Sequence, residues 1–172
     1  KKDKDKVTAL ETSSRLFEIL GSKLISFATQ YFTVFSETFL KSSKTLKPQT
    51  EAAILSCVSS MILSLDVLIA QHMEYFLDVL FSRPLSQPLY ITLVNATNYI
   101  PSIVKLVDKK LLDMISKILF GFFFNQLPEV TVSDCIPETK DTSIVELALQ
   151  ISGSFNFDPY DLSDFLWKMT EI

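Results

Sequence analysis

The feature that most limits the possible folds of this chain is an apolar period of 3.6 residues that recurs through most of the sequence. Such a period places the apolar side chains on one face of an α-helix. Glycine is scarce, with three residues among 172, and the prolines fall between the periodic segments. Because few residues interrupt the expected helices, the sequence predicts an all-α protein.

The most apolar of the expected helices covers residues 48–65. Pro48 suits its first turn, where a backbone N–H has no partner within the helix. A helix that is apolar or small on nearly all sides is expected to lie between two neighbours, so this helix should be among the most buried. The predicted core residues are Leu55, Val58, Met61, Ile62, Leu77, Leu111, Met114, Leu147 and Ile151.

Turn signals group the expected helices into four antiparallel hairpins, at 6–42, 48–82, 86–121 and 142–170, with a loop at 122–141. The first two hairpins begin about 40 residues apart, which is the period of HEAT and armadillo repeats. We therefore expect residues 1–172 to form one segment of a right-handed α-solenoid, as a fragment of a larger chain. An irregular bundle of the same helices would also fit the periodicity.

The last expected hairpin begins with a capping box formed by Ser143 and Glu146. Its second helix is apolar on more than one face and needs a neighbour to cover it. We therefore predict an exposed interface at Phe165, Trp167 and Met169.

Composition narrows the classes of partner. The net charge is −4, and Arg15 and Arg83 are the only arginines, so few groups can bind phosphate or guanine in the bidentate manner of arginine. This argues against a nucleic-acid partner. Cys57 and Cys135 are expected to be reduced thiols in a cytosolic or nuclear chain.

We expect no membrane-spanning segment. The uncharged run Ala52–Leu65 is too short and is followed by Asp66, and the run Pro84–Val104 is interrupted by prolines and asparagines.

The sequence predicts no catalytic, cofactor-binding or metal-binding residues. The single histidine, His72, has no nucleophile and no orienting acid near it in sequence, so a helix-surface position is expected. The three glycines are far apart and cannot form a phosphate-binding loop. The motifs of protein kinases and of zinc sites are also absent from the sequence.

Three segments resemble the target of rapamycin kinases. They are EAAILSCVSSMILSLD at Glu51–Asp66, KKLLDMISKIL at Lys109–Leu119 and IVELALQISGSFNF at Ile144–Phe157. Their order and spacing are similar to a segment of the long N-terminal HEAT-repeat solenoid of that family. The resemblance extends over most of the chain and is most specific in the last segment.

The resemblance implies a non-catalytic scaffold segment of a serine/threonine protein kinase whose kinase domain lies far downstream. It implies protein partners: a raptor-type substrate-recruiting subunit, other subunits or a dimer mate, and the adjacent repeats of the parent chain. It also implies a cytoplasmic location and a role in growth signalling. Two other interpretations stay open. One is an independent HEAT- or armadillo-like adaptor, and the other is a helical module that binds an apolar ligand or a membrane surface.

Overall fold

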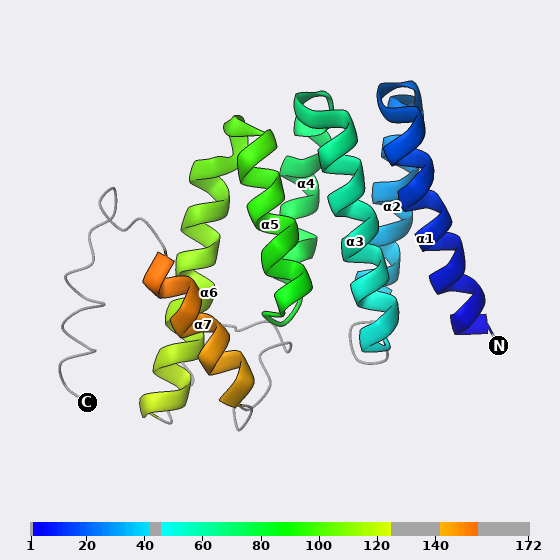
Figure 1. Ribbon diagram of the computed structural model, residues 1–172. Coiled ribbons are helices and arrows are strands. Elements are labelled where there is room, and N and C mark those ends of the chain that lie inside the picture. Colours follow the sequence, from blue (N-terminus) through cyan, green and yellow to red (C-terminus); the bar gives the residue numbers. More distant parts are fainter. Residues whose placement is uncertain (1, 42–45, 125–141, 155–172) are drawn as a thin grey trace. The chain divides into compact units, whose positions relative to one another are not determined.

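The computed structural model describes residues 2–41, 46–124 and 142–154, and every regular element in these ranges is helical (Figure 1). The prediction of an all-α protein is confirmed for this part of the chain. The α-helices are α1 (Lys2–Leu20), α2 (Ile25–Lys41), α3 (Pro48–Leu65), α4 (Ala70–Phe81), α5 (Gln87–Tyr99), α6 (Val104–Phe124) and α7 (Thr142–Ser154), and three 3₁₀ turns join them, η1 (Gly21–Leu24), η2 (Asp66–Ile69) and η3 (Pro101–Ile103).

Two helices continue past the glycine residues that were expected to end them. α6 continues past Gly121 to Phe124, and α7 continues past Gly153 to Ser154. A glycine inside a helix costs about 1 kcal/mol relative to alanine, which weakens a helix without ending it. The rest of the expected loop and the second helix of the last expected hairpin lie outside the described residues.

The chain divides into two compact units. Unit 1 comprises Lys1–Arg83 and Gln87–Asp108, and unit 2 comprises Pro84–Ser86 and Lys109–Ile172. The division passes through the third expected hairpin, because α5 belongs to unit 1 and most of α6 to unit 2. The expectation that residues 1–172 form one repeat segment of a larger chain stays a prediction.

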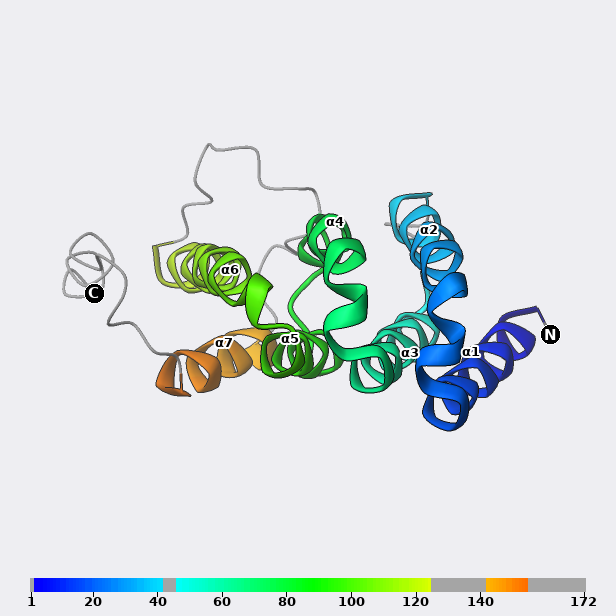
Figure 2. The same cartoon turned by 90° about the horizontal axis from the view of Figure 1, so that it is seen from above.

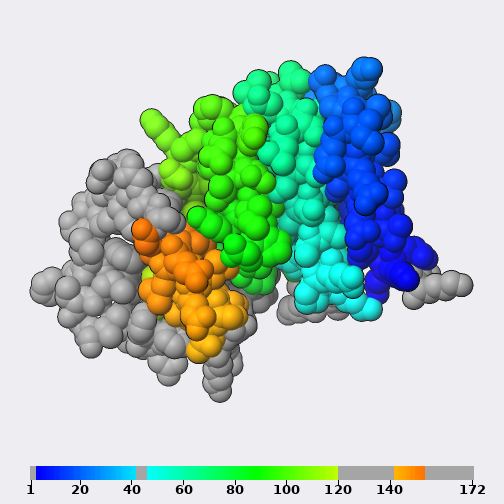
Figure 3. Space-filling model, in the orientation of Figure 1, coloured from blue at the N-terminus to red at the C-terminus, as the bar shows by residue number. Residues whose placement is uncertain are grey.

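Unit 1 is built from two layers of helices. α3 packs against α1 on one side and against α5 on the other, and α2 packs against α4 in the second layer (Figure 2). The helices α1, α3 and α5 run in the same direction, and α2 and α4 run back (Figure 1). The side chains of α1, α3 and α5 lie against one another along the first layer (Figure 3). The position of α3 between two neighbours explains why its sequence is apolar or small on nearly all sides.

The turns that follow α1 and α3 repeat the same backbone features. Gly21 has a φ of 52° and Asp66 a φ of 51°, and each begins a four-residue 3₁₀ turn that leads into the next helix. A positive φ is inexpensive for glycine and unfavourable for other residues. The connections α1–α2 and α3–α4 therefore both begin with a residue of positive φ and continue as a 3₁₀ turn.

The core of unit 1 lies along α3 and the helices beside it. Leu55, Val58, Met61 and Ile62 are completely buried on α3, and so is Leu77 on α4.

Polar side chains also cross the interfaces of α3. Ser60 donates to Glu18 of α1 at 3.2 Å, and Ser59 donates to the buried Thr92 of α5 at 3.1 Å. These bonds satisfy hydroxyl groups that burial would otherwise leave without partners.

In unit 2, both helices bury one stripe of side chains. Leu111 and Ile151 are buried, as is Ala148, whereas Met114 and Leu147 are half-buried and do not belong to the core as expected. Ile115 and Ala148, the next residues along the helices, take the buried positions. Consecutive side chains point about 100° apart around a helix, so Met114 and Leu147 lie at the edge of the buried stripe, next to Ile115 and Ala148.

Among the described residues, one run, Pro48–Phe81, is apolar and long enough to cross a membrane by length and composition, and half of its most apolar window is buried inside the protein. This run is not one straight helix, because it consists of α3, η2 and α4 and changes direction at Asp66. Packing of α3 between α1 and α5 accounts for its apolar character.

Candidate interaction surface

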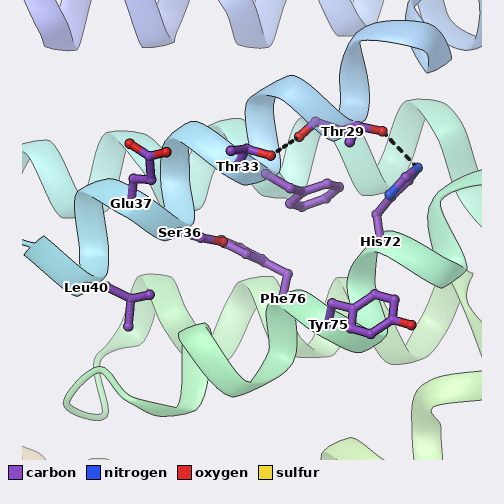
Figure 4. A pocket seen from close by; sticks show the side chains of 9 residues that line it. Thr29, Thr33, Ser36, Glu37, Leu40, His72, Tyr75 and Phe76 are labelled. Carbon is purple, nitrogen blue, oxygen red and sulfur yellow. Dashed lines mark hydrogen bonds between the residues drawn. The ribbon is translucent and has the colours of Figure 1, made fainter.

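A groove between α2 and α4 lies on the surface of unit 1. Its volume is about 360 Å³, and α2 and α4 supply all of its walls (Figure 4). The lining residues are Thr29, Phe32, Thr33, Ser36, Glu37, Leu40, His72, Tyr75 and Phe76. We call it the α2–α4 groove.

The floor of the α2–α4 groove is aromatic. The rings of Phe32 and Phe76 are both buried, and their centroids lie 4.9 Å apart. Phe76 also stacks near Phe39, at 6.3 Å, which ties α4 to the end of α2. Aromatic pairs of this kind stabilise the contact between two helices beyond the area that they bury. The floor is therefore a fixed surface of the fold.

The hollow itself results from small side chains on one face of α2. The small residues Thr29, Thr33 and Ser36 follow the i, i+4, i+7 spacing of a helix face, and the larger Leu40 continues the same row. The Thr33 hydroxyl donates to the backbone carbonyl of Thr29 at 2.8 Å, so it folds back onto its own helix (Figure 4). Threonine and serine at these positions leave space that leucine or phenylalanine would fill.

His72 forms one end of the α2–α4 groove. Its Nε2 atom lies 3.4 Å from the Thr29 hydroxyl, and its ring stacks on Phe32 with centroids 6.1 Å apart. Neither neighbour is an acid that could orient a catalytic base. His72 is partly exposed on α4 and contributes to the wall of the groove, in agreement with the expected helix-surface position.

The walls of the α2–α4 groove carry exposed apolar groups and an acidic group. Tyr75 is 84% exposed and Leu40 is 63% exposed, on opposite walls. Glu37, the carboxylate among the lining residues, accepts from Lys41 at 2.9 Å. An apolar hollow with polar edges is typical of a surface that binds another molecule.

α1 and α2 also carry exposed apolar side chains that do not line the groove. Leu16, Ile19, Phe27 and Val34 are all partly or largely exposed, with Ile19 at 78%.

Groups suited to chemistry are sparse in the described ranges. In residues 2–41, 46–124 and 142–154, no three or more His, Cys, Asp and Glu side chains lie close enough to hold a metal ion. Cys57 is buried, and burial raises the pKa of its thiol from the ordinary value of 9.0 to about 11, with a smaller opposing effect from a Ser14 hydrogen bond. A thiol with a raised pKa is a poor nucleophile.

The predicted interface at Phe165, Trp167 and Met169 lies outside the described residues. The groove was not among the predicted sites. Its sequence signal was the row of small hydroxyl residues Thr29, Thr33 and Ser36 within an otherwise apolar helix. That signal shows a face without large side chains, but it does not show which helix lies opposite.

Comparison with known proteins gives distant relatives. Over 96% of its length, the chain is 26% identical to the serine/threonine-protein kinase tor1 of Schizosaccharomyces pombe. Over 69% it is 34% identical to the serine/threonine-protein kinase TOR of Arabidopsis thaliana, and over 73% it is 21% identical to the serine/threonine-protein kinase mTor of Drosophila melanogaster. The chain spans 5–8% of the length of these relatives. No protein-family model and no solved structure matches the chain.

Proposed function

We propose that this chain is a scaffold segment of a target of rapamycin kinase, which acts through protein–protein contacts and takes no part in phosphoryl transfer. The observation that carries the proposal is the 26% identity to the fission yeast kinase over 96% of the chain. A match along nearly the whole chain requires the order of the helices to agree, and not only one apolar motif. Residues that correspond to less than a tenth of such a kinase form only a small part of it.

The architecture of unit 1 supports a repeat scaffold. Two helical pairs with the same positive-φ turn stack side by side, and α5 continues the first layer. In a HEAT-type solenoid each pair buries its apolar face against the next pair, and the layers become binding surfaces. We propose that unit 1 is a stretch of such a right-handed solenoid.

The proposed partners are proteins. By resemblance to the family they are a raptor-type subunit, a dimer mate or another subunit of the complex, together with neighbouring repeats of the parent chain, in the cytoplasm. The net charge of −4 and the scarcity of arginine support protein over nucleic acid. The exposed apolar residues of unit 1 give such partners a surface to bury.

Two experiments test the proposal. An antibody raised against this chain should detect, in cells of the source organism, a polypeptide more than ten times its mass of 19.5 kDa, because the relatives are longer by that factor. Mass spectrometry of that band should find peptides of a kinase domain. Detection of a stable 19.5 kDa protein alone would contradict the proposal and favour an independent adaptor.

The second experiment tests the non-catalytic role. The purified chain should transfer no phosphate when it is mixed with radiolabelled ATP, magnesium and a generic kinase substrate. In a separate binding assay, it should co-purify with a raptor-type subunit. Phosphate transfer above the blank would contradict a scaffold role if it persists after inhibitors of contaminating kinases are added. Failure to bind the subunit would remove this partner from the proposal.

A further inference from the structure

We draw no further inference here: the strongest candidate, the apolar groove between α2 and α4, carries none, because nothing in the structure shows what covers it.

Discussion

Met61→Ala should lower the free energy of unfolding of unit 1 by about 3 kcal/mol. Met61 is 0% exposed and lies on α3, the helix packed between α1 and α5. Truncation of a buried methionine to alanine costs about 2–5 kcal/mol, and the cost rises with the cavity that remains. Neighbours on both sides hold the walls of this cavity in place, so we expect little collapse and a value in the middle of that range.

Met61→Asp should cost more, because it adds an unpaired carboxylate to the same site. A loss above about 4 kcal/mol is a large part of the 5–15 kcal/mol that stabilises an ordinary domain. The urea midpoint of unit 1 should therefore fall below that of the Met61→Ala variant. Met61→Leu, which conserves volume, should cost less than about 1.5 kcal/mol.

Urea denaturation followed by far-ultraviolet circular dichroism measures these changes, and amide hydrogen exchange assigns the unfolding to unit 1. Leu63→Ala is the control on the same helix, because Leu63 is about half exposed, and it should cost about 0.5 kcal/mol or less. A loss below about 1 kcal/mol for Met61→Ala, or an equal loss for Leu63→Ala, would refute the burial of α3 between its two neighbours.

Three further substitutions test other parts of unit 1. Asp66→Gly should raise the free energy of unfolding, measured in urea, by about 1 kcal/mol. The reason is that Asp66 has a φ of 51° and a ψ of −136°, a conformation that only glycine adopts easily, and an unchanged free energy would contradict this strain. Glu51→Gln should lower the free energy of unfolding by about 1–3 kcal/mol in low and high salt alike, because Glu51 pairs with the 4% exposed Arg83 at 2.6 Å. A loss of stability that disappears in high salt would show instead that the ion pair is exposed to solvent. In a Cys135→Ser background, Cys57 should resist alkylation until urea unfolds the protein. Its pKa is raised on folding, so the stability that it contributes is complete below pH 9.0 and is lost as the pH rises toward about 11, and Cys57→Ser should flatten this part of the pH profile.

The sequence by itself determined the helices. The 3.6-residue period, the scarcity of glycine and Pro48 at the start of α3 are local features, and the conformation that they favour depends on neighbours along the chain. The composition of α3 also indicated its place between two other helices, because a helix without a polar face must be covered on both sides. The resemblance to target of rapamycin kinases came from the sequence as well, and the comparisons support it as a distant similarity.

The tertiary structure decided where helices end and which residues on a stripe are buried. Gly121 and Gly153 lie inside helices, because the cost of one glycine is smaller than the gain from the helical bonds around it. Met114 and Leu147 are half-buried beside buried neighbours. One position on a helix corresponds to about 100° of rotation, and only the packing of the neighbouring elements sets that angle.

The α2–α4 groove also exists only in the tertiary structure. Thr29 and Thr33 show from the sequence that one face of α2 lacks large side chains, but His72 and Tyr75 come to that face from more than 30 residues away. Their arrival depends on the turns at Gly21 and Asp66, whose positive φ values set the direction of the helices that follow. A periodic pattern describes each helix alone, whereas a groove is a property of two helices, and its shape is fixed by the aromatic contacts that join them.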